Sequence, residues 1–380
     1  MDFELNDEQR MIRDMTRDFA TNELEPLAEK TDHEHKFPAE IIAKMGSLGL
    51  MGVPYPEKYN GGGMNYQCYA IAVEEISRAC ASTGVIMSAH CSLSCDPIYK
   101  FGTEEQKKKY LSRMASGEWI GCFGLTEPGA GSDAAALSTT AKDAGDKWII
   151  NGSKLFITNA AEAKVCVLFA TTDKSKGHRG INAFIVEMDY PGVRVGKIED
   201  KLGIKGSSTA EIVFEDAEVP KENLLGEPGK GFSVALATLD GGRIGIAAQA
   251  VGIGRAALEK SAAYAKERVQ FGKPIAEHQA IQWMIADSAV EIDAARLLTR
   301  RAAWMKDNGI RSTKESAMAK LFAAEAASRA TSKAVQIHGG YGYIKDYPVE
   351  RYFRDAKITE IYEGTSEIQR LVIAASLLKD

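Results

Sequence analysis

The sequence predicts an α+β protein built from a helical N-terminal part, a β-sheet part and a helical C-terminal part. Apolar residues recur at helical spacing up to about residue 120. Short segments rich in β-branched and aromatic residues, separated by turn residues, occupy about 121–226. Beyond them the chain is alanine-rich and again helical in pattern. We therefore expect an N-terminal α-helical domain at 1–120, a middle antiparallel β domain at 121–230 and a C-terminal α-helical bundle domain at 231–380.

Capping signals mark the helices expected in the N-terminal part. Asn6 followed three residues later by Gln9 resembles a capping box, and Thr103 with Gln106 repeats the pattern. Pro38 suits the first turn of a further helix, because the backbone N–H that proline lacks is not needed there. These signals predict several separate helices before residue 120.

The middle part carries strand signals at intervals too short for helical crossovers. Turn residues such as Asn151-Gly152 separate the segments. The expected strands lie near 148–150, 164–170, 181–187 and 210–219. Without room for helices between them, these strands predict antiparallel pairing rather than βαβ units.

The C-terminal part reads as a helical bundle. Alanines at 323, 327, 330 and 334 form a small-residue face that allows close helix packing. Residues 252–257 (GIGRAA) match a dinucleotide-binding pattern, but they lie inside a continuous helical run. That pattern works only where glycines turn a strand into a helix, so helix packing is the better interpretation.

Composition excludes several classes of protein. The 380 residues carry 47 basic and 52 acidic side chains, a formal net charge of −5, and 45% are hydrophobic. This balance is typical of globular proteins and argues against nucleic-acid binding. No signal-peptide pattern occurs, and no stretch approaches the roughly 18 apolar residues of a membrane span. Six cysteines without a CxxC pair suggest reduced core residues, so we expect a cytoplasmic protein that does not bind membranes.

A glycine-rich loop at 125–133 (LTEPGAGSD) is the first candidate for ligand binding. Gly129 and Gly131 would let backbone N–H groups approach an anion, while Thr126 and Ser132 offer hydroxyl groups. An ordinary turn has the same composition. The position of this loop at the helix-to-strand junction favours a role in a cleft between domains.

Two further segments leave their role open. Arg268 follows a long helical run, where a cation either offsets the helix macrodipole or contacts a diphosphate. Gly339, Gly340 and Gly342 exceed what one helix C-cap requires, which suggests backbone brought close to a ligand or a neighbouring subunit. His338 stands alone without an HxH or HExxH pattern, so we expect no metal site.

Glu363 is the candidate general base. It follows Ile361 and Tyr362, whose apolar groups would partly desolvate its carboxylate and raise its pKa. Thr365 or Ser366 would cap the last helix. A solvated loop acid is the alternative interpretation of the same residues.

These motifs together resemble the acyl-CoA dehydrogenase family, from Asn6 to Leu378. The resemblance is carried by six ordered blocks at 125–133 (LTEPGAGSD), 151–158 (NGSKLFIT), 226–232 (GEPGKGF), 268–272 (RVQFG), 336–340 (QIHGG) and 361–365 (IYEGT). The residues at 239–246 (LDGGRIGI) and 347–351 (YPVER) are most similar to those of the short-chain, butyryl-CoA branch of this family.

The resemblance implies a flavoenzyme, usually a homotetramer, with N-terminal helices, a middle β domain and a C-terminal four-helix bundle. FAD would lie between the β domain and the bundle, held partly by a neighbouring subunit. The implied FAD contacts are Phe123, Leu125, Thr126, Gly131, Ser132, Phe156, Ile157, Thr158, Arg268, Phe271, Gln279, Gln336, Ile337, His338, Gly339, Gly340, Thr365, Ser366 and Glu367. The implied substrate contacts are Ser132, Asp240, Arg243 and Gly364.

The same resemblance places the catalytic base at Glu363. This carboxylate would take the α-proton of an acyl-CoA while the β-hydride leaves to the flavin, and the Glu363 backbone N–H would polarise the thioester oxygen. Some relatives carry the base on an earlier helix, at the position of Gly242 here, which has no side chain to serve. The expected electron acceptor is electron-transferring flavoprotein.

The expected substrate is a short, uncharged acyl-CoA. Reverse enoyl-CoA reduction, a branched or cyclic substrate, an oxidase and a non-catalytic flavin-bearing interaction protein remain alternatives; Glu363 weighs against the last. By resemblance, the acyl pocket wall lies at about 82–97, and no Arg or Lys occurs between Ala79 and Tyr99 to pair with a terminal carboxylate. His90 and Asp96 are either structural or polar pocket features.

Overall fold

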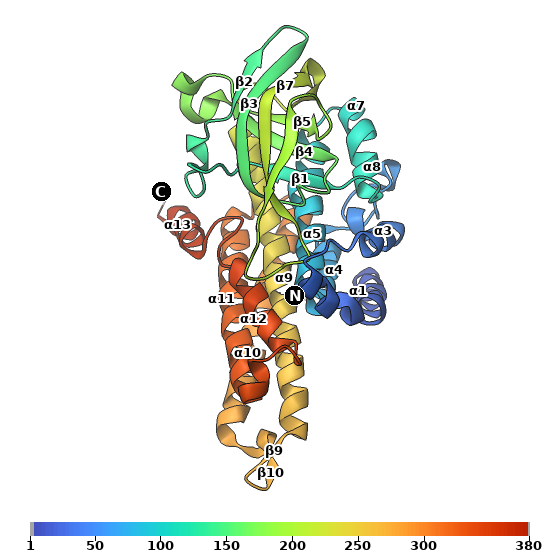
Figure 1. The fold of residues 1–380 in the computed structure, drawn as a ribbon, viewed down its shortest axis with the longest axis vertical. Coiled ribbons are helices and arrows are strands. Elements are labelled where there is room, and N and C mark those ends of the chain that lie inside the picture. Colours follow the sequence, from blue (N-terminus) through green and yellow to red (C-terminus); the bar gives the residue numbers. More distant parts are fainter. Residues whose placement is uncertain (1–3, 379–380) are drawn as a thin grey trace.

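The structure is a computed structural model that describes residues 4–378, so the outer ends of the first and third expected domains lie outside it. The elements follow the predicted order of helices, strands and helices. Figure 1 shows an elongated molecule with the sheet at one end of the long axis and the small strands β9 (Val269–Gln270) and β10 (Lys273–Pro274) at the other.

The N-terminal helices begin where the capping signals predict. Asn6 caps the first helix in a capping box with Gln9, and Thr103 does the same with Gln106. Pro38 lies just before its helix and not within the first turn. The helices are α1 (Asp7–Phe19), α2 (Ala28–Glu34), α3 (Ala39–Ser47), α4 (Tyr66–Ala79), α5 (Ala81–Ser88), the π-helix η5 (Ala89–Cys95), α6 (Asp96–Phe101), α7 (Glu104–Gln106) and α8 (Ser112–Ala115).

The middle part is one mixed sheet, with strands in the order β6-β7-β3-β2-β4-β5-β8 and β1 paired to β4. The strands are β1 (Gly121–Gly124), β2 (Thr140–Asp143), β3 (Lys147–Thr158), β4 (Val165–Thr171), β5 (Ile181–Glu187), β6 (Val193–Ile198), β7 (Thr209–Pro220) and β8 (Leu224–Leu225). Most neighbouring strands pair antiparallel, as expected, but β1 and β2 both pair parallel with β4, so the expected antiparallel sheet is a mixed one. Residues 125–164 connect β1 to β4 through a loop and the β2–β3 hairpin, which is long enough for a parallel return without a helix.

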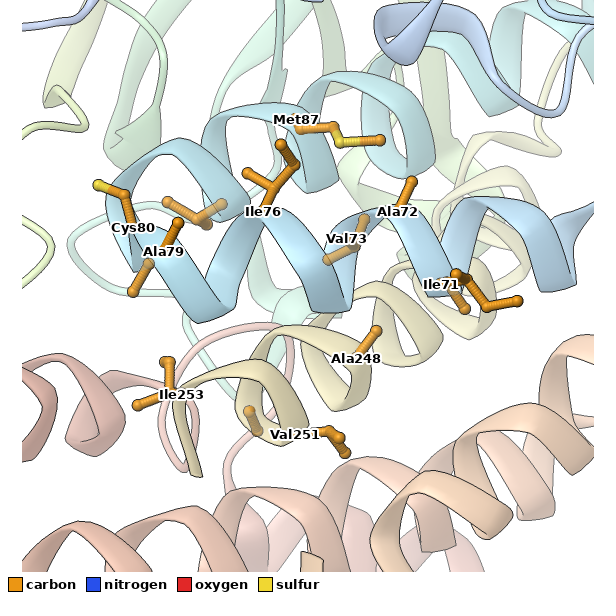
Figure 2. Packing of buried hydrophobic residues seen from close by; sticks show 14 of the residues in the cluster. Ile71, Ala72, Val73, Ile76, Ala79, Cys80, Met87, Ala248, Val251 and Ile253 are labelled. Atoms are coloured by element: carbon orange, nitrogen blue, oxygen red, sulfur yellow. The ribbon is translucent and has the colours of Figure 1, made fainter. Parts of the chain in front are cut away.

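The C-terminal part packs around one long helix. Its helices are α9 (Gly231–Glu267), α10 (Gln279–Asp307), α11 (Thr313–His338), the 3-10 helix η11 (Gly339–Gly342), α12 (Val349–Ile358) and α13 (Ser366–Leu377). Helix α9 also packs on α4, and Figure 2 shows Ala248 of α9 pointing toward α4, while Ile76 on the other side of α4 points toward Met87 of α5.

The glycines of the GIGRAA segment serve this helix packing. A Cβ at Gly252 would lie 2.5 Å from the Glu74 carbonyl oxygen of α4, and the Cβ position of Gly254 faces Ile292 of α10. The segment lies inside α9, so the interpretation as helix packing is confirmed. All six cysteines are buried and free of disulfides.

Candidate active site

Glu363 lies in the loop between α12 and α13 with its carboxylate buried. Oε2 of Glu363 has no hydrogen-bond partner among residues 4–378. Burial raises the pKa of this carboxyl to about 7, although the positive charges of Lys320 and Arg243 act to lower it. A carboxylate with this pKa can accept a proton near neutral pH.

The loop that carries Glu363 is held by several polar side chains. The Lys320 ammonium donates to the Gly364 carbonyl oxygen at 2.7 Å. The Gln369 amide donates to the carbonyl oxygens of Glu363 and Gly364 at 3.2 and 2.8 Å. Thr365 caps α13 by accepting a hydrogen bond from the backbone N–H of Ile368, as the sequence predicts for one of two candidates.

Helix α9 supplies the surface that faces this base. A Cβ at Gly242 would overlap with Oε2 of Glu363 and would lie 2.7 Å from Cδ2 of Leu93 in η5. One residue further, Arg243 pairs with Asp240 at 2.8 Å, and its Nε is buried without a partner in the described part of the chain. The structure therefore brings Gly242, Arg243 and Glu363 together, and leaves polar atoms free for a ligand.

The glycine-rich loop after β1 is fastened from behind by a buried ion pair. The Lys154 ammonium of β3 lies 2.7 Å from Oε1 of Glu127 and also donates to the Leu125 carbonyl oxygen. Glu127 further accepts hydrogen bonds from Ser138 and Thr139. Although burial raises it, the pKa of Glu127 is held at about 2, chiefly by the Lys154 charge.

The outer side of this loop is open and fits a bound flavin nucleotide. No heavy atom lies within 4 Å of a Cβ placed at Gly129 or Gly131, so their backbone is free to approach a ligand. Phe156 near the end of β3 has φ +59° and is 60% exposed, which is unusual for an aromatic side chain unless a ligand covers it. Asn159, just after β3, donates to carbonyl oxygens of Ile86 and Gly121, which ties this strand to α5 and β1.

A second group of candidate flavin contacts lies far from the first. Arg268 follows the last residue of α9, about 38 Å along the helix from Gly242 at roughly 1.5 Å per residue. Phe271 in the adjacent turn is 95% exposed. Figure 1 shows this turn at the end of the molecule opposite the sheet. One copy of the chain therefore does not bring all of the predicted flavin contacts together.

This second group surrounds a cavity of its own, with a volume of about 470 Å³. It is lined by Tyr264, Arg268, Gln270, Ile275, Ile337, His338, Gly339, Gly340, Tyr341 and Ile344. His338 stacks on Tyr264 with ring centroids 4.2 Å apart, and its Nδ1 lies 2.8 Å from the Ala334 carbonyl oxygen. Among residues 4–378, no group of three or more His, Cys, Asp or Glu side chains is placed to hold a metal ion. The cavity offers an arginine and glycine backbone, which suit a phosphate group.

His90 and Asp96, left open by the sequence, both have protein partners. Nδ1 of His90 accepts from the Gly121 backbone N–H at 3.0 Å, and Nε2 lies 2.9 Å from the Met114 carbonyl oxygen. Asp96 pairs with Lys100 at 2.8 Å and with Lys306 at 3.3 Å. Both side chains are buried and bonded within the fold, which confirms the structural interpretation of His90.

Several residues that shape the site were not predicted from the sequence. Lys320 and Lys154 are both fully buried, and Gln369 and Glu127 accompany them. The one available signal was the spacing of Lys320, which lies three and four residues before Ala323 and Ala324 on the alanine face of α11. A lysine at such a position must find a polar partner inside the protein.

Comparison with known proteins gives matches along the whole chain. The models for the N-terminal, middle and C-terminal domains of acyl-CoA dehydrogenase match residues 6–118, 122–217 and 229–378. The chain is 57% identical over 376 residues to the mitochondrial short-chain specific acyl-CoA dehydrogenase of Bos taurus, covering 99% of this chain and 91% of that protein.

Two solved structures superpose over the full length of both chains. Butyryl-CoA dehydrogenase from Megasphaera elsdenii has a TM-score of 0.98 and 48% identity, with 100% of each chain covered. A chain in a structure described as an electron transferring flavoprotein of Acidaminococcus fermentans has a TM-score of 0.99 and 54% identity, again with 100% of each chain covered. None of the helices within residues 4–378 combines the length and apolar character needed to span a membrane.

Proposed function

The chain belongs to the acyl-CoA dehydrogenase family and catalyses the FAD-dependent α,β-dehydrogenation of short-chain acyl-CoA thioesters, and we propose that Glu363 is the base that takes the α-proton. The observation that supports this role is the buried, unbonded Oε2 of Glu363 facing the bare backbone of Gly242. FAD, when bound, supplies the acceptor for the hydride that leaves the β-carbon.

The residues around Glu363 prepare it for this step. Burial keeps water away from the carboxylate and raises its pKa to about 7, so that it can hold the α-proton after removing it. Arg243 and Lys320 supply positive charge that keeps part of the population ionised before the substrate reacts. The Glu363 backbone N–H would polarise the thioester oxygen, where negative charge develops.

The replacement of Glu363 by glutamine tests this role. The amide keeps the size of the side chain and removes the base, so flavin reduction by butyryl-CoA under anaerobic conditions should slow by about 10²–10⁴-fold. FAD content and binding of the acyl-CoA should persist. Glu360→Gln is a matched control, because Glu360 lies in the same loop but pairs with Lys357. Near-normal reduction of the flavin in Glu363→Gln would reject the assignment.

FAD would be held by residues from two copies of the chain. The loop at 125–132, the β3 residues 156–158 and the start of α13 would hold it in one copy. Arg268, Phe271, Gln279 and residues 336–340 would reach it from another. The distance between the two groups in one chain supports this arrangement.

We propose a homotetramer as the assembly that joins the two groups. Helix α10 supports association because it carries an exposed apolar stripe at seven-residue spacing: Trp283, Val290, Leu297 and Trp304, which are 60%, 70%, 42% and 48% exposed. Exposed apolar rows of this kind are typical of protein interfaces. Sedimentation analysis should give four chains, and dilution to monomers should release FAD. A monomer that retains FAD would contradict the proposal.

Electron-transferring flavoprotein is the proposed electron acceptor. The likeness to a chain in the Acidaminococcus fermentans structure supports this choice. An anaerobic assay with butyryl-CoA and an electron-transferring flavoprotein should show rapid transfer between the two flavins. Fast peroxide formation in air would instead indicate an oxidase.

A further inference from the structure

We propose that Lys320 of α11 is a positioning residue for the base: its ammonium, hydrogen-bonded to the Gly364 carbonyl oxygen, holds the loop that carries Glu363 and places a positive charge near this carboxylate. This inference deepens the proposed function and rests on the role of Glu363 as the base. It assigns a task to a buried charge for which the packing of α11 gives no other reason.

Burial of the Lys320 ammonium destabilises the fold unless polar groups inside the protein compensate it. Its side chain is fully buried, and the neighbouring positions on this helix face are alanines, among them Ala323, Ala324 and Ala327. An ammonium group inside a protein needs compensation for its lost hydration. Within residues 4–378 Lys320 forms no salt bridge, and its hydrogen bond goes to the Gly364 carbonyl oxygen at 2.7 Å. The positive charge of Lys320 is therefore directed at the loop that carries Glu363.

The loop at Glu363 needs this restraint. Glu363 has φ +54° and Gly364 has φ +93°, so two consecutive residues adopt left-handed backbone conformations. A residue that bears a side chain is strained in this region and persists there only where its surroundings hold it. Lys320 and Gln369 are the groups that bond the carbonyl oxygens of this pair. Loss of either bond should let the loop relax and misdirect the carboxylate.

The positive charge of Lys320 also differs from that of Arg243, the other cation near Glu363, because Arg243 is paired with a carboxylate. The ionisable groups that interact with Glu363 come from every element around it: Arg243 on α9, Lys320 on α11, Tyr66 and Tyr69 on α4, and Tyr362 in its own loop. The tyrosines are neutral, because burial raises the pKa of each. Arg243 is paired with Asp240 at 2.8 Å. Burial lowers the pKa of Lys320 to about 8, while the negative charges of Glu363, Glu360 and Glu367 act to raise it. Among residues 4–378 none of these carboxylates forms a salt bridge with Lys320, so its charge is not neutralised by a close partner as that of Arg243 is.

These two effects predict separable results. The base must be ionised to react, so the rate of flavin reduction by butyryl-CoA rises with pH through the pKa of Glu363. Removal of the Lys320 charge raises that pKa and moves the midpoint of the profile to higher pH. Removal of the uncharged Gln369 amide, which only restrains the loop, should slow the reaction at every pH without moving the midpoint.

The experiment measures anaerobic flavin reduction against pH in the FAD-loaded enzyme for Lys320→Met, Lys320→Gln, Lys320→Arg and Gln369→Leu. Lys320→Met and Lys320→Gln should raise the midpoint by about one pH unit, which slows the reaction about tenfold below it. Lys320→Arg should keep the midpoint near that of the wild type. Gln369→Leu should be slower throughout with its midpoint unchanged. Lys333→Met is the control and should match the wild type, because Lys333 lies on the same helix but is half-buried and pairs with Asp287 of α10.

A second readout does not depend on turnover. The infrared difference between the wild type and Glu363→Gln isolates the carboxyl band of Glu363, and a pH titration of this band gives the pKa of Glu363. In Lys320→Gln this pKa should rise by the same amount as the midpoint of the rate profile. An unchanged midpoint in both neutral Lys320 variants, or an equal shift in Gln369→Leu, overturns the inference. If Lys320→Met does not fold, Lys320→Gln carries the test. Failure of the proposed function would appear separately, as rapid flavin reduction in Glu363→Gln.

Discussion

The backbone of Gly242 lies directly against the carboxylate of Glu363, with no room for a methyl group between them. Gly242→Ala should therefore displace the base, although alanine favours the helix by about 1 kcal/mol. We expect flavin reduction to fall on the order of 10²-fold, since a displacement of about 1 Å has effects of this size. Thermal melting should show an intact fold. A variant that reduces its flavin at the wild-type rate would show that Glu363 does not occupy this position in the working enzyme.

The buried pair of Lys154 and Glu127 should control how well the enzyme retains FAD. Removing one partner leaves an uncompensated buried charge, which costs about 3–5 kcal/mol. Lys154→Met or Glu127→Gln should thus lower the melting temperature and release flavin from the loop at 125–132. The double variant should be less destabilised than the sum of the two, because neither charge remains. Additive losses would show that the two side chains do not act as a pair.

The order of helices and strands was predictable because it depends on local patterns. The capping boxes at Asn6 and Thr103 and the helical period around Gly252 are read from residues close in sequence. The parallel pairing of β1 with β4 was not predictable in the same way. It depends on contacts between Gly121 and Val165 and their neighbours, which lie more than forty residues apart and are equally apolar in either register.

The features of the site that depend on neighbouring residues were likewise predictable, and those that depend on distant contacts were not. Glu363 was identified from its motif, and the apolar neighbours Ile361 and Tyr362 anticipated the direction of its pKa shift. The burial of Lys320 and Lys154 was not foreseen, because a lysine in sequence carries no mark of the carbonyl or carboxylate that it meets. The wide separation of Arg268 from Gly242 required the length of α9 in three dimensions.

Arg268→Ala should weaken FAD retention and leave the chemistry intact when excess FAD is supplied. Loss of a charge-assisted contact with phosphate costs on the order of 1.5–3 kcal/mol, or about 10–100-fold in affinity. Lys266→Ala is the matched control, because Lys266 is exposed in the last turn of α9 and also carries a positive charge, two residues before Arg268. FAD dissociation measured by fluorescence separates the two variants. Equal retention in both would reject the diphosphate role of Arg268.

His90 should make the enzyme less stable in mild acid. Burial lowers the pKa of His90 to about 4, whereas an unfolded chain protonates near 6.5. The unfolded state therefore binds more protons between these values, and about 3 kcal/mol of stability is lost as pH falls from 6.5 to 4. His90→Gln should be less stable at pH 7.5, and its melting temperature should fall less steeply toward pH 4. If the melting temperatures of the two proteins fell equally steeply with pH, protonation of His90 would not be the cause of the loss of stability in acid.

Butyryl-CoA should be preferred to glutaryl-CoA in competitive turnover, because no Arg or Lys occurs on the expected pocket wall between Ala79 and Tyr99 to pair with a terminal carboxylate. Lys100 and Lys306 both pair with Asp96 at the end of this wall, and Lys306 also lies over the face of the Tyr66 ring. Burying an unpaired carboxylate costs several kcal/mol, so we expect at least about 10²-fold discrimination. Asp96→Asn should release Lys306 and narrow that gap, with hexanoyl-CoA as the uncharged control. Preference for glutaryl-CoA in the wild type would contradict the uncharged pocket, and preference for cyclohexanecarboxyl-CoA would contradict the butyryl assignment while leaving Glu363 as the base.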